Sequence, residues 1–367
     1  MHAELESLRG SGIRIAALGG GTGLSSMLRG LKLCSENITA IVTTADDGGS
    51  SGMLRQDLGI IPPGDIRNCI LALANTEPTM EQLLNHRFSE GSLAGQSFGN
   101  LFLAALTGIS GSFDTAIRQM SEVLAVTGRV LPVSVGPTVL EAVFENGMRV
   151  SGESSITECK KRQKCRIQKV RLIPETAKAN ADVLESVERA ELVVLGPGSL
   201  YTSVIPNLLV AGVAGALKAT RALRVYVCNI MTQEGETEGY SCFDHAREIT
   251  DHAGGPVFDV CLVNNAPVPE DILRRYAGES AGAARIDRKL FAEAGIELQE
   301  RPLLRVRDGQ VRHHPLRLAH ALTELLIEKR PRAGLYGQAD EALRDWMREQ
   351  IIVEDRNRAA GEVHAQF

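Results

Sequence analysis

Apolar segments and polar, glycine-marked loops alternate along the first part of the chain. An apolar run over residues 13–18 leads into a glycine turn and then into a helical repeat formed by Leu24, Leu28 and Leu31. A second apolar run, over residues 38–44, predicts another strand. A strand, a glycine turn and a helix in this order are typical of the first unit of a nucleotide-binding α/β sheet.

The same alternation continues after a proline-marked loop at residues 62–65. The patterns predict helices over about 66–74, 79–88, 97–126, 179–190 and 315–329, and strands over 130–135, 192–195, 224–229, 258–263 and 303–306. A long helical stretch is expected after residue 199. Because strands that alternate with helices favour parallel pairing, we expect an α/β, Rossmann-like fold with a doubly wound, mainly parallel sheet.

The middle of the chain interrupts this alternation. Residues 139–145 and 166–173 are strand-like, and Asn146-Gly147 is a hairpin signal. We therefore expect a small β-rich insertion at about 136–175 within a domain of residues 12–330. Residues 331–367 are polar, with helical spacing around Leu343 and Trp346, and are expected to form a C-terminal helical extension. That extension is either a peripheral helix or an appendage that binds a partner.

Composition narrows the class of protein. The chain has 36 glycines but only nine Phe, five Tyr and one Trp, and its net charge is −5. This balance favours loops that approach a ligand closely and argues against a nucleic-acid partner. The seven cysteines include no C-x-x-C pair, and no apolar run is long enough to span a bilayer or to act as a signal peptide. We therefore expect reduced thiols and a cytoplasmic location.

The first glycine turn, residues 19–23, matches neither of two familiar phosphate-binding patterns. It lacks the Gly-Lys-Ser/Thr ending of a P-loop, and Leu24 stands where the dinucleotide fingerprint needs its last glycine. Successive backbone N–H groups at a helix N-terminus nevertheless form an anion site. The alternative is a tight turn that serves only the fold.

A second turn, Gly196-Pro197-Gly198-Ser199, also follows a predicted buried strand. Two such turns in one sheet are what a diphosphate at a topological switch point needs. Asp46 and Asp47 end the second predicted strand, where carboxylates hold ribose hydroxyls, or magnesium and phosphate together with Asp65. Capping of a polar loop is the alternative for this pair. No nucleophile elbow or convincing Cys-His arrangement is present, so no catalytic residue is assigned.

Six motifs in order resemble the bacterial gluconeogenesis factor family, which is related in fold to 2-phospho-L-lactate transferase. The resemblance covers roughly residues 12–330. The motifs are GGGTGL at 19–24, DDGGSSG at 46–52, PPGDIRN at 62–68, FGNL at 98–101, LGPGSLYTS at 195–203 and NIMTQ at 229–233.

The resemblance implies a cytoplasmic protein that binds UDP-sugars, notably UDP-N-acetylglucosamine, and that acts in carbon metabolism and in control of the cell envelope and cell shape. It also implies nucleotide-sugar contacts at Tyr276, whose ring is suited to stacking on uracil, and at Arg312, which is suited to a diphosphate. One departure is Glu234, where many relatives have proline, so the loop carries an additional charge. The ligand-binding set is then Gly20, Gly21, Thr22, Gly23, Asp46, Asp47, Ser50, Ser51, Asp65, Asn68, Asn100, Gly196, Gly198, Ser199, Thr202, Asn229 and Thr232.

Three functions follow from these observations. The first is a regulatory UDP-N-acetylglucosamine-binding factor that forms a homo-oligomer and docks on an enzyme of amino-sugar or central carbon metabolism. The second is a magnesium-dependent transferase of the 2-phospho-L-lactate transferase type, with Asp46, Asp47 and Asp65 on the metal. The third is an NAD-linked oxidoreductase, which the residue at position 24 disfavours.

Overall fold

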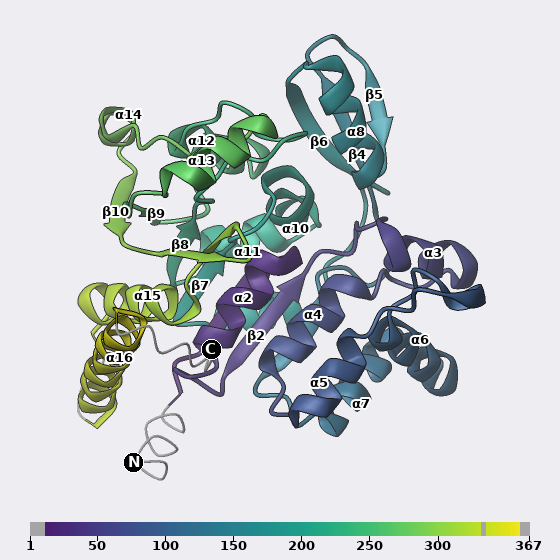
Figure 1. Cartoon of the computed structure of the whole chain (residues 1–367), viewed down its shortest axis with the longest axis horizontal. Helices are drawn as coiled ribbons and strands as arrows, with labels where there is room; N and C mark the ends of the chain where they lie inside the picture. Colours follow the sequence, from purple (N-terminus) through teal and green to yellow (C-terminus); the bar gives the residue numbers. More distant parts are fainter. Residues whose placement is uncertain (1–11, 332–334, 360–367) are drawn as a thin grey trace.

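The computed structural model describes residues 12–331 and 335–359 of the chain. Its centre is a seven-stranded sheet in which every neighbouring pair of strands is parallel (Figure 1). The doubly wound α/β fold predicted from the sequence is confirmed. The strands of this sheet are β1 (Ile15–Gly19), β2 (Ile38–Val42), β3 (Arg129–Pro132), β7 (Leu192–Leu195), β8 (Leu223–Val227), β9 (Val260–Asn264) and β10 (Glu297–Arg301).

The order of the strands creates a switch point at the middle of the sheet. Across the sheet the order is β10-β9-β8-β7-β1-β2-β3, so the chain winds outward from β1 in one direction and from β7 in the other. In open parallel sheets, ligands bind beyond the carboxyl ends of the two strands at which the winding reverses. Both predicted glycine turns follow these two strands.

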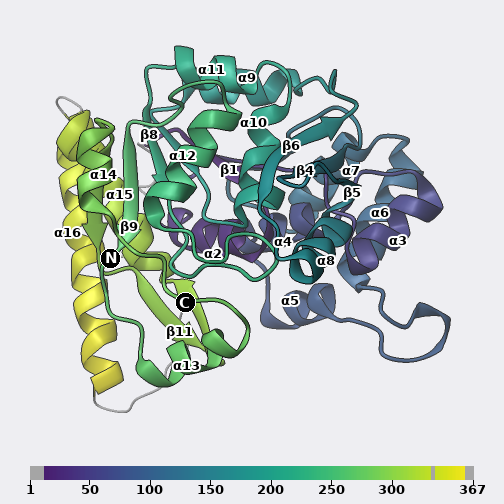
Figure 2. The same cartoon turned by 90° about the horizontal axis from the view of Figure 1, so that it is seen from above.

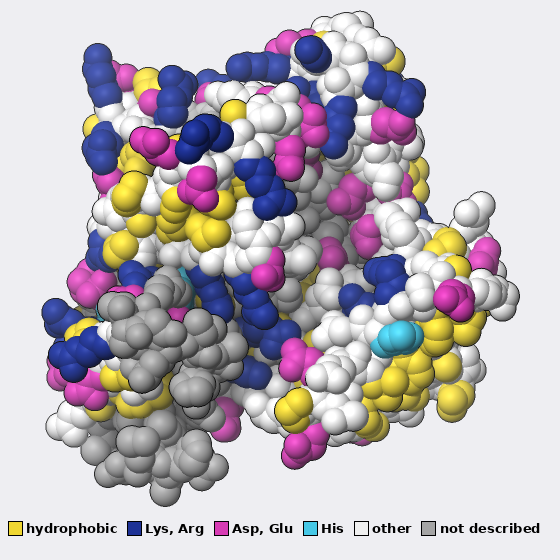
Figure 3. Space-filling view, in the orientation of Figure 1, with side chains coloured by type: hydrophobic (Ala, Val, Ile, Leu, Met, Phe, Trp, Pro, Cys, Tyr) yellow, Lys and Arg dark blue, Asp and Glu magenta, His cyan; other side chains and the backbone are white. Residues whose placement is uncertain are grey.

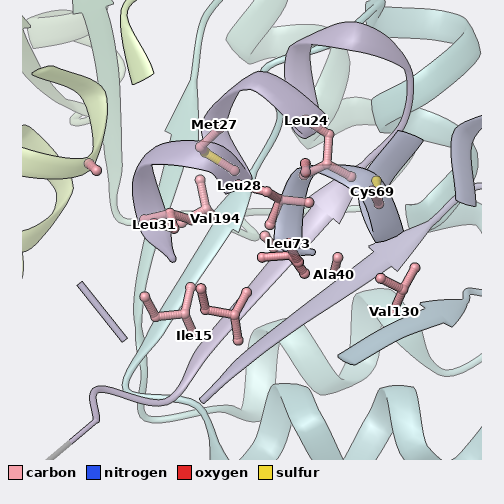
Figure 4. Packing of buried hydrophobic residues seen from close by; sticks show 14 of the residues in the cluster. Ile15, Leu24, Met27, Leu28, Leu31, Ala40, Cys69, Leu73, Val130 and Val194 are labelled. Carbon is pink, nitrogen blue, oxygen red and sulfur yellow. The ribbon is translucent and has the colours of Figure 1, made fainter. Parts of the chain in front are cut away.

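Helices cover both faces of the sheet and bury its apolar side chains. Leu24, Leu28 and Leu31 of the first helix are fully buried against the sheet and against Leu73 of a neighbouring helix (Figure 4). The helices of the structure include α2 (Gly21–Leu31), α3 (Gly49–Leu58), α4 (Gly64–Leu73), α5 (Pro78–Asn85), α6 (Phe98–Ser110), α7 (Phe113–Val123), α9 (Ala181–Arg189), α12 (Cys242–His252), α13 (Glu270–Gly278), α14 (Arg288–Glu293) and α15 (Pro315–Lys329).

The insertion contains the expected antiparallel strands and one helix that the sequence pattern did not predict. β4 (Val139–Phe144) lies between β5 (Arg149–Ser151) and β6 (Ile167–Ile173), and α8 (Glu153–Gln163) packs on them. An apolar repeat is missing from α8, where Ile156 is the main buried hydrophobic residue. In place of an apolar repeat, α8 has the Lys160 side chain buried against Glu238.

Several boundaries differ from the predictions for identifiable reasons. The region 97–126 is two helices, because Gly111 adopts a left-handed conformation and Ser112 caps α7. The polar segment after Asp47 is helix α3 rather than a loop. The stretch after Ser199 is broken into a π-helical turn (Leu200–Val204), α10 (Ile205–Leu209) and α11 (Val213–Ala219), with Gly212 in the left-handed region between the last two.

The strand predicted at 303–306 lies outside the main sheet. It forms β11 (Leu304–Arg307), which pairs antiparallel with β12 (Gln310–His313) in a hairpin. The seventh strand of the main sheet is instead β10, which the sequence pattern did not predict because its side chains are polar or charged apart from one leucine.

The C-terminal helix α16 (Leu335–Ala359) lies beside α15 (Figure 2). Leu343 and Met347 are buried in the same core as the sheet, and His314 Nε2 lies 2.9 Å from a carboxylate oxygen of Glu354. The extension is therefore a helix packed on the domain, and its binding of a partner stays a prediction. All seven cysteines are free of disulfides, and five of them are buried. Within residues 12–331 and 335–359, no helix combines the length and apolarity needed to cross a membrane.

Candidate functional site

A cavity of about 480 Å³ lies beyond the carboxyl ends of β1 and β7. This volume is within the usual range for small-molecule sites. The hollow near the centre of the face shown in Figure 3 lies at this edge of the sheet. The walls of the cavity come from the two glycine turns, the loop after β8, α13, the β11–β12 hairpin and α8 of the insertion.

The two glycine turns pack backbone against backbone. A Cβ atom on Gly23 would lie 2.6 Å from the carbonyl oxygen of Pro197, and one on Gly20 would lie 2.7 Å from a carboxylate oxygen of Asp65. Gly21 has φ +65°, a conformation that favours glycine. These contacts leave no room for side chains at Gly20 and Gly23, and the first turn lines the cavity at the N-terminus of α2.

Side chains from the loop after β8 hold the second turn in place. The Asn229 amide donates to the carbonyl oxygen of Gly198 at 2.8 Å and accepts from its N–H at 3.3 Å. The Ser199 hydroxyl donates to Gln233 at 2.7 Å, and the Thr232 N–H donates to Gly282 O at 2.7 Å. Asn229 and Thr232 therefore shape the cavity wall through their hydrogen bonds.

Tyr276 of α13 and Arg312 of β12 also line the cavity. The Tyr276 hydroxyl accepts a hydrogen bond from the Val311 N–H at 3.0 Å, which ties α13 to the hairpin. The Arg312 guanidinium donates to Gln310 Oε1 at 2.7 Å and to Val311 O at 2.9 Å. No carboxylate pairs with it among the residues that the structure describes, so its charge is available to a ligand.

Four acidic side chains gather beside the first turn: Asp46, Asp65, Glu153 and Glu236, here called the carboxylate group. Burial raises the pKa of Asp65 to about 6 and the pKa of Glu236 to about 7, and the pKa of Glu153 also rises on burial. Mutual repulsion among these carboxylates adds to the effect. Buried carboxylates of this kind are common at functional sites.

The three predicted magnesium ligands do not converge. Asp47 accepts a hydrogen bond from the Ser154 N–H at 2.9 Å and so faces the insertion, while Asp46 and Asp65 belong to the carboxylate group. In the described part of the chain, no group of three or more His, Cys, Asp or Glu side chains is arranged to hold a metal ion. The residues present therefore do not form the metal site that the sequence suggested.

The predicted ligand-binding residues divide into two sets. Those that line the cavity are Gly20, Gly21, Thr22, Gly23, Gly198, Ser199, Asn229, Thr232, Tyr276 and Arg312. Those that the structure places outside its lining are Asp46, Asp47, Ser50, Ser51, Asp65, Asn68, Asn100, Gly196 and Thr202.

The outer set has partners within the protein. Asn100 donates to the Ser50 hydroxyl at 3.1 Å, and Asn68 accepts from Arg67 at 2.6 Å. The Ser51 hydroxyl accepts from the Gly64 N–H at 3.0 Å. Thr202 lies beside Glu153 and Glu236 of the carboxylate group. A direct role in ligand binding stays a prediction for these residues.

Sequence reasoning missed several side chains of the cavity. Thr157 and Lys161 come from α8, and His313 follows Arg312 on β12. Burial lowers the pKa of His313 to about 4, so this imidazole is neutral. The spacing of Glu153, Thr157 and Lys161 at every fourth residue is the signal that places them on one helix face.

Comparison with known proteins identifies the family. Residues 15–304 match the family model described as 2-phospho-L-lactate transferase CofD. The chain is 51% identical to a putative gluconeogenesis factor of Clostridium acetobutylicum over 87% of this chain and 71% of that protein. It is 45% identical to the gluconeogenesis factor of Bacillus subtilis over 86% of this chain and 98% of that protein.

A crystal structure of a protein from Bacillus halodurans has the same fold. It superimposes with a TM-score of 0.82 at 44% identity, covering 85% of this chain and 99% of that one. The family model covers both glycine turns, α8, the loop after β8 and α13. The chain therefore belongs to the gluconeogenesis factor family, within the wider CofD family.

Proposed function

We propose that this protein is a regulatory factor that binds a nucleotide sugar, UDP-N-acetylglucosamine, in the cavity at the switch point. The observation that carries the proposal is the arrangement of that cavity. Both glycine turns line it together with Tyr276 and Arg312, and no carboxylate in the described part of the chain pairs with that arginine. Backbone N–H groups at the N-terminus of α2 suit a diphosphate, because phosphate oxygens accept hydrogen bonds and the helix dipole favours negative charge.

Different side chains suit different parts of the ligand. The Tyr276 ring is suited to stacking on the uracil, and the Arg312 guanidinium adds a positive charge for the diphosphate. The carboxylate group lies beside the first turn but outside the cavity lining, so its contact with ligand hydroxyls stays a prediction. Asp46 and Asp65 are its members from the motifs predicted to bind ribose.

We further propose a role in the cytoplasm that links carbon metabolism to synthesis of the cell envelope and to cell shape. The names of the relatives in Clostridium acetobutylicum and Bacillus subtilis support a general role in gluconeogenic growth. In this proposal the ligand-bound protein is a homo-oligomer and docks on an enzyme of amino-sugar or central carbon metabolism.

Calorimetry and thermal unfolding with UDP-N-acetylglucosamine test the proposed ligand. A ligand present at about 100 times its dissociation constant stabilises the fold by about 2.7 kcal/mol. We expect binding by the wild-type protein and a large loss of affinity in Arg312→Ala. Absence of binding, or equal affinity in Arg312→Ala, would falsify the proposal.

A second candidate is the transfer of a group from a nucleotide-linked donor. The observation that favours it is the carboxylate group next to the phosphate turn, in a chain that matches a transferase family model. Incubation with nucleotide-linked donors and a range of acceptors, with and without magnesium, tests it. Product that disappears in Asp65→Asn supports transfer, and absence of turnover with every pair removes it.

A further inference from the structure

Helix α8 of the insertion forms one wall of the cavity. Glu153, Thr157 and Lys161 are spaced four residues apart, so they lie on the same face of the helix. Glu153 belongs to the carboxylate group, while Thr157 and Lys161 line the cavity. In Figure 1 the insertion stands above the carboxyl end of β2.

Contacts along its length hold α8 in position. At its beginning the Ser154 N–H donates to Asp47 at 2.9 Å, and near its end the buried ammonium of Lys160 lies 2.8 Å from Glu238. In between, Gly235 packs so closely that a Cβ there would lie 2.6 Å from a methyl carbon of Thr157. These contacts fix the insertion to the loop after β8. Lys161, which follows Lys160 in α8, therefore has a defined place at the cavity.

Lys161 forms an ion pair with Glu234, at 2.9 Å between Nζ and the carboxylate. Both side chains line the cavity, and they are 45% and 37% exposed. Exposed pairs of this kind are weak, because water screens both charges. A stronger anion that enters the cavity can therefore replace Glu234 as the partner of Lys161.

The charges of the cavity show what Lys161 can supply. Among the described lining residues, the cationic side chains are Lys161 and Arg312, and the acidic ones are Glu234 and Glu279. The glycine turns contribute hydrogen-bond donors but no net charge. Positive charge favours a dianionic diphosphate in this cavity, and Lys161 is the lysine among its described lining residues.

We propose that Lys161 is a diphosphate-binding residue supplied by the insertion, and that Glu234 is the internal counterion which the ligand displaces. The proposal rests on the function proposed above. It assigns the insertion a role in recognition, and it assigns Glu234 a role that lowers affinity. The two side chains of one ion pair therefore have opposite effects on binding.

Calorimetric titration of the full chain with UDP-N-acetylglucosamine tests this assignment. We expect Lys161→Met to weaken binding about tenfold or more, because a charge-assisted hydrogen bond is lost. Glu234→Gln is expected to tighten binding about two- to fivefold, because a competing partner is removed. Lys161→Arg retains most of the affinity.

Arg162→Met is the matched control. Arg162 is on the same helix and carries the same charge, but it pairs with Glu158 and does not line the cavity. Its removal is expected to change affinity by less than twofold. Equal losses in Lys161→Met and Arg162→Met would mean that only the general charge of α8 matters, and the assignment would be wrong.

The remaining outcomes separate this inference from the proposed function. Binding by the wild type that is unchanged in Lys161→Met, or not tightened in Glu234→Gln, overturns the inference and leaves the function standing. If the wild type does not bind UDP-N-acetylglucosamine, the proposed function fails, and titration with inorganic pyrophosphate then tests Lys161 alone. Pyrophosphate affinity that is equal in wild type and Lys161→Met overturns the inference in that case.

Discussion

Replacement of Gly23 by alanine is the sharpest test of the site geometry. The new Cβ would lie 2.6 Å from the carbonyl oxygen of Pro197 and 2.9 Å from its carbonyl carbon. Real Cβ contacts are essentially never shorter than 3.0 Å, so the two turns must separate by at least 0.4 Å. The neighbouring atoms belong to the backbone and cannot move aside as a flexible side chain does. Overpacking of this kind costs about 1–3 kcal/mol.

Two further glycines provide matched controls for the same chemical change. In the same helix, a Cβ on Gly30 would lie 2.1 Å from the carbonyl oxygen of Pro315, at the contact between α2 and α15 and outside the cavity lining. In α6, Gly108 has nothing within 4 Å of such a Cβ. Gly108→Ala is expected to stabilise the protein by about 0.5–1 kcal/mol, because alanine is the better helix former.

Urea unfolding and calorimetric titration of the three variants distinguish these effects. Gly23→Ala and Gly30→Ala are both expected to lower the free energy of unfolding. Only Gly23→Ala is expected to weaken binding of UDP-N-acetylglucosamine, by about tenfold or more, because separated turns misplace the phosphate-binding N–H groups. Unchanged stability and affinity in Gly23→Ala would refute the close packing of the two turns.

Three other predictions concern pH, the hydroxyl of Tyr276 and the C-terminal helix. The pKa of Glu236 is about 7 in the folded state and ordinarily 4.5. Its proton therefore stabilises the fold fully below about pH 4.5, and this stabilisation is lost as the pH rises through 7. Glu236→Gln should gain roughly 3 kcal/mol over the wild type between pH 4.5 and pH 8, and parallel pH profiles of unfolding would contradict this. Tyr276→Phe removes the hydrogen bond to Val311 but keeps the ring, so calorimetry should show a smaller loss of affinity than in Tyr276→Ala. Met347→Ala should cost about 2–5 kcal/mol of stability in urea unfolding, because this side chain of α16 is fully buried, and a cost below 0.5 kcal/mol would show that the helix is peripheral.

The pattern of hydrophobic residues predicted those elements whose own residues show a clear strand or helix pattern. The run at residues 192–195 is wholly apolar and forms β7, and α15 begins and ends at the predicted residues. The glycine turns were identified because glycine is the residue that permits a close backbone approach. The helix α8 and the strand β10 were missed, because charged side chains occupy them and tertiary ion pairs, such as Lys160 with Glu238, offset the cost of their burial.

The parallel α/β class, the two glycine turns and the family could all be predicted from the amino-acid sequence. Tyr276 and Arg312 were predicted too, through a resemblance and not through a physical pattern. The sequence could not predict which polar motif residues reach the cavity, because that depends on where the hairpin and the insertion fold back over the sheet. Asp47 accepts a hydrogen bond from Ser154 of the insertion, whereas Lys161, 114 positions later, lines the cavity. Contacts between residues so distant in the chain leave no local pattern in either segment.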